Sequence, residues 1–203
     1  METLSQSPTN PAFVQDPYPF YDRARAGSDL FRWEEYGLVC ATSHHAVSAL
    51  MRDRRFGREA PDPLSFPQHL GPFYAVEAHS MLELEPPRHT RLRGLVLRAF
   101  TSRRINALGP ELHLLCGRLI DAFPAGPFDL LDLYGRVIPV VVIARLLGVP
   151  ESRAPDLLAW SNAMVAMYQA GRTRAVEDRA VAATLAFRAF GEAVIAERRA
   201  APG

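Results

Sequence analysis

The sequence contains no lysine: all 23 of its basic residues are arginine, and 22 acidic residues balance them to a net charge of +1. We attribute the absence of lysine to GC-rich coding, with a preference for contacts to anions as the alternative. A nearly neutral chain has no overall field that would attract nucleic acid or an anionic membrane. Any electrostatic role of the arginines must be local, so we expect neither nucleic acid nor a membrane among the partners.

Cysteines and long apolar runs are also scarce. Cys40 and Cys116 lie far apart in a chain without a charged leader followed by an apolar segment, so we expect free thiols and a reducing, cytoplasmic location. The longest apolar run, residues 137–144, contains a proline and falls well short of the roughly 20 residues that a membrane span requires. These features predict a soluble protein.

Composition and turn residues predict one domain that is mainly α-helical with a small β-sheet. With 203 residues, 48% of them hydrophobic, the chain can bury the core of one domain. The prolines of residues 11–19 favour extended backbone, and a short helix then ends at Gly27. Alternating apolar residues on both sides of residues 34–37 predict a hairpin, and residues 44–53 predict a helix.

The next segment predicts a loop and the rest of the chain predicts helices. Residues 57–80 contain four prolines and two glycines without sustained helical periodicity, which predicts a long loop. Three aromatic residues in this loop are expected to be exposed: Phe66, Phe73 and Tyr74. From Pro86 onward, apolar residues recur with a period near 3.6, which predicts a series of helices. Three turn segments interrupt them: residues 123–127, 148–152 and 170–174.

Six arginines and one histidine are concentrated in MLELEPPRHTRLRGLVLRAFTSRRI, residues 81–105. Pro86 and Pro87 suit the first turn of a helix, where the missing amide hydrogen costs nothing. At about 100° per residue, one stripe of this helix, roughly 60° wide, holds four residues: His89, Arg93, Val96 and Phe100. The flank beside the stripe is expected to face the core: Leu92, Leu95 and Ala99. Arg91 and Arg98 project to the opposite side.

This helix has two interpretations. A solvated face with arginines is the default, because one His-x-x-x-Arg spacing is expected by chance in a chain with 6 histidines and 23 arginines. The alternative is a ligand-binding face, on which the imidazole of His89 and the guanidinium of Arg93 lie one turn apart over apolar surface. That arrangement suits a pair of carboxylates on a flat apolar ligand.

The longer string favours the second interpretation. Residues 81–105 resemble the C-helix segment of soluble bacterial cytochromes P450, the haem-thiolate monooxygenases, in which Met-Leu-x-x-Asp-Pro-Pro-x-His-Thr-Arg-Leu-Arg precedes Ala-Phe-Thr; here Glu85 replaces the aspartate. Three further segments resemble the family in order along the chain: NPAFVQDPYPFYDRARA (10–26), GLVCATSHHAVSALMRDRRFG (37–57) and FDLLDLYGRVIPVVVIARLLGVPES (128–152). The resemblance implies a cytochrome P450-like fold, with residues 1–203 as the N-terminal part of a single domain, from the A to the G helix, and no second domain.

The resemblance implies that the protein is a haem-thiolate monooxygenase. Such an enzyme inserts one atom of dioxygen into a small apolar organic substrate, carries haem b, and takes electrons from an acidic ferredoxin or flavoprotein. We expect a monomer when the protein is complete. By the same resemblance, His89 and Arg93 would bind the haem propionates and Phe100 would pack near the edge of the porphyrin.

The resemblance also implies contacts to the substrate and to the electron donor. Residues 57–80 would lie over the substrate, and helices at residues 156–170 and 173–199 would cover it. Four residues are therefore candidates for substrate contact: Phe73, Tyr74, Met164 and Met167. Met164 and Met167 form a helical stripe with Tyr168 that also fits plain core, and that alternative stays open. Four arginines are candidates for docking the electron donor, with a solvated helix end as the alternative: Arg91, Arg98, Arg103 and Arg104.

The signatures that carry the chemistry of the family are missing from these residues. We find no acidic-threonine pair on a long distal helix and no Phe-Gly-x-Gly-x-His-x-Cys-x-Gly loop. Cys40 and Cys116 lack the flanking glycines and histidine, so both are interpreted as buried structural thiols. We therefore expect no catalytic residue, no metal ligand and no axial cysteine, in a chain truncated before the distal helix and the haem-thiolate loop. Two alternatives remain: a non-catalytic remnant of such an enzyme, or a helical ligand-binding transcriptional regulator.

Overall fold

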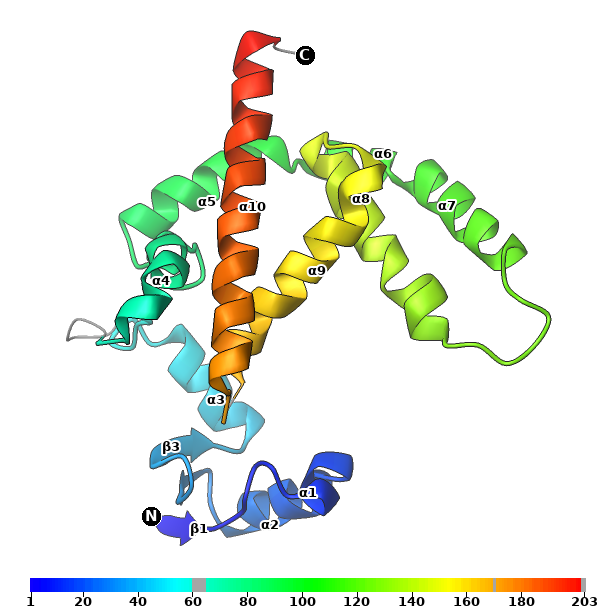
Figure 1. The fold of residues 1–203 in the computed structure, drawn as a ribbon. Coiled ribbons are helices and arrows are strands. Elements are labelled where there is room, and N and C mark those ends of the chain that lie inside the picture. Colours follow the sequence, from blue (N-terminus) through cyan, green and yellow to red (C-terminus); the bar gives the residue numbers. More distant parts are fainter. Residues whose placement is uncertain (60–64, 170, 202–203) are drawn as a thin grey trace. The chain divides into compact units, whose positions relative to one another are not determined.

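The computed structural model describes residues 1–59, 65–169 and 171–201. They form two compact units, Met1–Arg58 and Glu59–Gly203, each of which is described by itself (Figure 1). Parts of the predicted loop at 57–80, of the predicted helix at 156–170 and of the last residues lie outside the described ranges. The described residues are mainly helical with a small sheet of three strands, which confirms the predicted fold class.

The first unit contains the sheet. β1 (Glu2–Leu4) runs parallel to β2 (Leu30–Trp33), and β2 pairs antiparallel with β3 (Leu38–Ala41). The β2–β3 pair is the predicted hairpin. Gly37 in its turn has a φ of 64°, a left-handed conformation that glycine adopts without steric cost. Residues of β2 and of the helix before it form the core of this unit: Phe20, Ala24, Phe31 and Trp33.

Three helices complete the first unit: α1 (Pro11–Gln15), α2 (Tyr18–Gly27) and α3 (His44–Arg52). The prediction of extended backbone over residues 11–19 is wrong, because α1 and the start of α2 lie there. The side chain of Asn10 accepts hydrogen bonds from the backbone N–H groups of Ala12 and Phe13, at 2.9 and 3.2 Å. With that cap in place, Pro11 starts a helix instead of preventing one.

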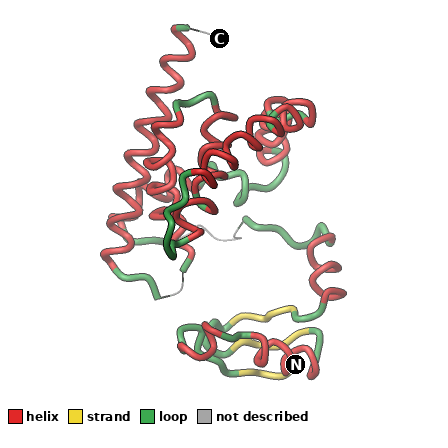
Figure 2. Tube along the Cα trace, turned by 90° about the vertical axis from the view of Figure 1, so that its right-hand side faces the viewer, coloured by secondary structure: helices red, strands yellow, loops and turns green. Residues whose placement is uncertain are grey.

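The regular elements in the described residues of the second unit are all helices, and the strands of Figure 2 all belong to the first unit. Its α-helices are α4 (Gly71–Glu77), α5 (Arg88–Ala99), α6 (Ser102–Ala107), α7 (Gly109–Asp121), α8 (Val137–Leu147), α9 (Ala154–Val165) and α10 (Arg174–Ala200). Short turns of other helix types precede or follow them: η1 (Gln68–Leu70), η2 (Leu131–Gly135), η3 (Glu151–Arg153) and η4 (Ala166–Tyr168). The predicted breaks at 123–127 and 148–152 fall between these helices.

Two clusters of buried residues hold the second unit together. One joins α7, α8 and α9 through Leu115, Val141 and Ala154. The other joins η1 and α4 to η4 and α10 through four residues: Leu70, Phe73, Met167 and Ala180. The second cluster fixes a short helix from the first half of the chain against the last and longest helix.

Three predictions about the elements of the second unit are wrong. The loop predicted at residues 57–80 contains η1 and α4, with Pro72 in the first turn of α4, and Phe73 is only 3% exposed. The flank of α5 expected to face the core does not do so, because the described residues bury no side chain of this helix and leave Leu95 47% exposed. α5 begins at Arg88, so Pro86 and Pro87 precede the first turn rather than occupy it.

Candidate functional site

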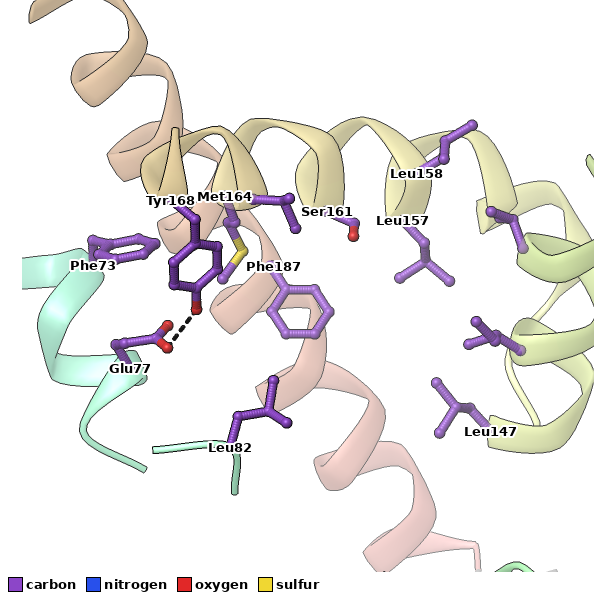
Figure 3. Close-up of a pocket in the computed structure, with 13 residues that line it drawn as sticks. Phe73, Glu77, Leu82, Leu147, Leu157, Leu158, Ser161, Met164, Tyr168 and Phe187 are labelled. Carbon is purple, nitrogen blue, oxygen red and sulfur yellow. Dashed lines mark hydrogen bonds between the residues drawn. The ribbon is translucent and has the colours of Figure 1, made fainter. Parts of the chain in front are cut away.

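A cavity of about 410 Å³ opens between α4, α8, α9 and α10 (Figure 3). Ten of its thirteen lining residues are apolar, and they come from all four helices and from the segment before α5. Phe73 and Met164 line one part of it, whereas Leu147 and Leu157 lie toward the other end. A concave, mostly apolar space of this size suits a small organic ligand.

The polar groups of the cavity are few and lie mainly at one end. The hydroxyl of Tyr168 donates a hydrogen bond of 2.5 Å to the Oε1 atom of Glu77 (Figure 3). This bond joins the end of α4 to η4, across 91 positions of the sequence. Ser161, on α9, is the third polar residue of the lining. A ligand in this cavity would therefore meet hydrogen-bonding groups at one end and aliphatic or aromatic surface elsewhere.

A charged network holds the helices beside this polar end. The Nε2 atom of His69 lies 2.8 Å from Oε2 of Glu177, and Arg172 donates to Oε1 of Glu177 at 3.1 Å and to the carbonyl of Met167 at 3.3 Å. The hydrogen bond from His69, helped by that from Arg172, holds the pKa of Glu177 below its ordinary value. The network ties η1, the turn after η4 and the first turn of α10 together.

The structure places the predicted substrate contacts in two groups. Phe73 and Met164 line the cavity. Met167 is 4% exposed within the buried cluster of the second unit, and Tyr74 packs against that cluster and stacks on Phe66 with a ring separation of 4.2 Å. Tyr74 and Met167 thus pack in or against the buried cluster that contains Phe73, and they do not line the cavity. A substrate role for the four predicted residues stays a prediction.

The predicted haem contacts all lie on or next to α5. His89 and Phe100 are half-buried and Arg93 is exposed. Among the described residues, the side chains of His89 and Arg93 have no hydrogen-bond or ion-pair partner. Two basic groups one turn apart therefore have no protein carboxylate beside them, and they are available to an anionic ligand.

The four arginines proposed to dock an electron donor are exposed. The side chains of Arg91, Arg98 and Arg103 have no hydrogen-bond or ion-pair partner within the described residues. Arg104 donates to the carbonyl of Leu146 at 3.4 Å, which links α6 to the end of α8. Their role in docking stays a prediction.

Neither cysteine is fully buried, which corrects the expectation of buried thiols. Cys40 on β3 and Cys116 on α7 are both free and half-exposed. Burial raises the pKa of the Cys40 thiol. A hydrogen bond with Cys116 raises the pKa of Tyr134, with burial as a smaller cause. The described residues contain no cluster of three or more histidine, cysteine or acidic side chains that could hold a metal ion.

Sequence reasoning missed several residues of the cavity. Glu77, Ser161, Tyr168 and Phe187 were not predicted as site residues, yet all line it. Tyr168 lies one helical turn after Met164, so the helical period offered a signal for it. Glu77 was hidden by the prediction of a loop, because without α4 its side chain had no defined direction.

None of the helices in the described residues is long and apolar enough to cross a membrane.

Comparison with known proteins connects this geometry to one group of enzymes. No protein-family model matches the sequence. The putative cytochrome P450 123 of Mycobacterium tuberculosis is 32% identical over 195 residues, which cover 94% of this chain and 47% of that protein. The cytochrome P450 monooxygenase PikC of Streptomyces venezuelae is 37% identical over 164 residues, or 75% of this chain and 38% of that protein.

A solved structure matches over a similar range. The epothilone B-bound cytochrome P450epoK superposes with a TM-score of 0.83 and 27% identity, covering 98% of this chain and 51% of that one. The chain thus spans about half or less of the length of the proteins that it matches.

Proposed function

This chain belongs to the cytochrome P450 family, of the bacterial type, and we propose that it supplies the haem-propionate contacts and most of the substrate cover of a haem-thiolate monooxygenase. The observation that carries the proposal is the apolar cavity between α4, α8, α9 and α10. The substrate would be a small, largely apolar organic molecule, since ten of the thirteen lining residues are apolar.

The residues of α5 fit haem. The side chains of His89 and Arg93 have no hydrogen-bond or ion-pair partner among the described residues, and Val96, in the same stripe of the helix, is 41% exposed. Basic side chains over apolar surface match a flat apolar group that ends in carboxylates. We propose that His89 and Arg93 bind the two propionates and that Phe100 packs near the ring edge. When bound, haem supplies the iron at which dioxygen is activated.

The cavity and α5 are joined by a short segment. Leu82, six residues before Arg88, lines the cavity, so the segment that leads into α5 also forms part of the wall. This continuity supports the proposal that substrate and haem lie on either side of one short stretch of chain. Orientation of the substrate then depends on Phe73, Leu82 and Met164, and exclusion of water depends on α9 and α10.

The axial ligand is not proposed for either cysteine of this chain. Cys116 lies within α7 next to Tyr134, and Cys40 pairs with Phe31 in the sheet of the first unit. We propose that a cysteine outside these 203 residues supplies the thiolate. Electrons would arrive from an acidic ferredoxin or flavoprotein docked on Arg91, Arg98, Arg103 and Arg104.

A chimera tests the proposal. Residues 1–203 would replace the matching half of the putative cytochrome P450 123 of Mycobacterium tuberculosis, whose remaining half is kept unchanged. We expect the purified chimera to retain haem and to give the reduced, carbon monoxide-bound absorption band of a thiolate-ligated haem. The remaining half alone serves as the control and should retain no haem. A chimera that folds but never takes up haem would contradict the proposal.

A further inference from the structure

The cavity contains one acidic residue and no basic one. Its three polar lining residues are Glu77, Ser161 and Tyr168, and only Glu77 carries a charge at neutral pH. Among the described residues, Glu77 forms no ion pair: its carboxylate accepts from the hydroxyl of Tyr168, which is neutral. The apolar wall therefore holds a carboxylate that forms no ion pair among the described residues, although Arg88 donates to the neighbouring carbonyl of Ala78 at 3.1 Å.

Such a carboxylate selects ligands by charge. An ionised group beside apolar surface loses part of its hydration, and a cation that enters the cavity restores a favourable partner. A second anion would meet repulsion instead. The hydrogen bond from Tyr168 occupies Oε1, whereas Oε2 of Glu77 has no partner among the described residues and is left to accept from a ligand.

The positions of the lining residues define the rest of the ligand. Glu77 and Tyr168 lie together at one end of the lining, and Leu147 and Leu157 lie toward the other (Figure 3). A ligand that places a cation at Glu77 therefore extends its apolar body along Phe187 toward those leucines. We propose that the cavity binds amphiphilic amines, with the protonated nitrogen at Glu77 and an apolar body between α8, α9 and α10.

This inference rests on the proposed function, because it takes the cavity to be the substrate site, and it narrows the substrate class to organic cations. The side chain of Tyr168 is 61% exposed, so water reaches the polar end. We therefore expect a cation to bind with roughly tenfold higher affinity than a neutral analogue. This difference lies between the affinity gain from a buried charged pair and that from a fully exposed one.

Calorimetric titration of the 203-residue chain with three matched probes, at a concentration at which sedimentation velocity shows a monomer, tests the inference. The probes are 1-adamantanamine, 1-adamantanol and 1-adamantanecarboxylate, which share one compact apolar cage and differ in charge. At pH 7 and low salt, we expect the amine to bind roughly tenfold tighter than the alcohol, and the carboxylate to bind weakest. Added salt should narrow the difference, because it screens the partly exposed pair.

Two conservative variants identify the residue responsible. Glu77→Gln keeps an acceptor for Tyr168 and removes the charge, so amine and alcohol should bind equally. Glu197→Gln, which removes an exposed carboxylate from α10, is the matched control and should keep the preference. Circular dichroism establishes that both variants keep the helical content of the wild type.

The possible outcomes separate this inference from the function on which it rests. If alcohol and amine bind the wild type equally, the cavity takes apolar ligands and the inference about charge is wrong. If the preference persists in Glu77→Gln, another group recognises the cation and the inference is also overturned. If none of the probes binds, the cavity is not a ligand site, and the proposed function loses the observation that carries it.

Discussion

The carboxylate of Glu177 joins the first turn of α10 to the turn before it and to η1, which lies 108 positions earlier in the sequence. It accepts from His69 and from Arg172, and its side chain is only 16% exposed. Because the hydrogen bond from His69 lowers its pKa in the folded chain, this carboxylate stabilises the fold above the pKa it has when unfolded. That stabilisation is complete at neutral pH and is lost as the pH falls through the lowered pKa.

We predict that Glu177→Gln destabilises the second unit at pH 7 and that the difference from the wild type shrinks below about pH 5. The reason is that acid protonates the wild-type carboxylate and removes its negative charge. The variant has no such charge at any pH. Thermal unfolding from pH 7 to pH 3.5, followed by circular dichroism, measures the difference. Glu192→Gln removes an exposed ion pair with Arg188 and serves as the control. A constant difference at every pH would show that the charge of Glu177 plays no part.

Leu70 tests the buried cluster that holds α4 against α10. Its side chain is 0% exposed, between Phe73, Met167 and Ala180. We predict that Leu70→Ala lowers the free energy of unfolding by about 2–5 kcal/mol, because it removes buried methyl groups and leaves a cavity. Leu97→Ala, at a position that is 58% exposed, should cost well under half of that. Urea denaturation measures both, and equal losses would mean that the cluster does not stabilise the fold.

At the scale of elements, α5 presents two sides with different proposed roles. In the chimera, we predict that His89→Ala and Arg93→Ala release haem faster than Arg91→Ala and Arg98→Ala. A lost charge-assisted hydrogen bond to a propionate should cost about 1.5–3 kcal/mol, and a lost exposed arginine well under 1 kcal/mol. Transfer of haem to apomyoglobin gives the four rates. Equal rates would mean that the stripe of His89 and Arg93 does not contact haem.

The exposed arginines should act on electron transfer instead. We predict that Arg91→Ala and Arg98→Ala slow reduction of the chimera by an acidic ferredoxin, and slow it more at low salt than at high salt. The reason is that long-range steering between charged proteins is screened by ions. Stopped-flow reduction at two ionic strengths measures the effect. His89→Ala, compared at equal haem content, is the control; an identical slowing in that variant would contradict the division into two sides.

Local patterns were sufficient for some elements and misleading for others. The hairpin around Gly37 and the helices after residue 100 follow from alternation, helical period and turn residues, which act over a few positions. α1 and α4 were missed because Pro11 and Pro72 were interpreted as helix breakers, although both stand in the first turn of a helix. Proline is compatible with that position, and the cap from Asn10 decided the outcome at α1.

The candidate site shows where sequence information ends. Phe73 and Met164 were predicted near the substrate and line the cavity. The polar end was not predicted, because Glu77 and Tyr168 meet across 91 positions and neither has a local pattern that indicates the other. The apolar flank of α5 was predicted to face a core from its period alone, yet period does not tell which element covers a face.

At the scale of the whole molecule, the described residues leave many large apolar side chains exposed. On α5 they include Leu95, Val96 and Leu97, and around η2 they include Leu130, Leu131 and Leu133. Exposed apolar side chains in this number favour association, because each contact removes apolar surface from water. The matched proteins have about twice the length of this chain, so we infer that their remaining half covers the equivalent surface.

We therefore predict that the isolated 203-residue chain associates as its concentration rises and unfolds over a broad range of urea concentration, while the chimera stays monomeric. Sedimentation velocity over a hundredfold range of concentration measures the first effect, and urea denaturation followed by circular dichroism measures the second. Leu95→Glu in the isolated chain should reduce association, because it places a charge on the exposed flank of α5, whereas Thr90→Glu, at an exposed polar position about 140° around the helix, should reduce it less. A monomer with one sharp, two-state unfolding transition would instead identify these residues as a complete small domain, and the exposed flank of α5 as ordinary surface.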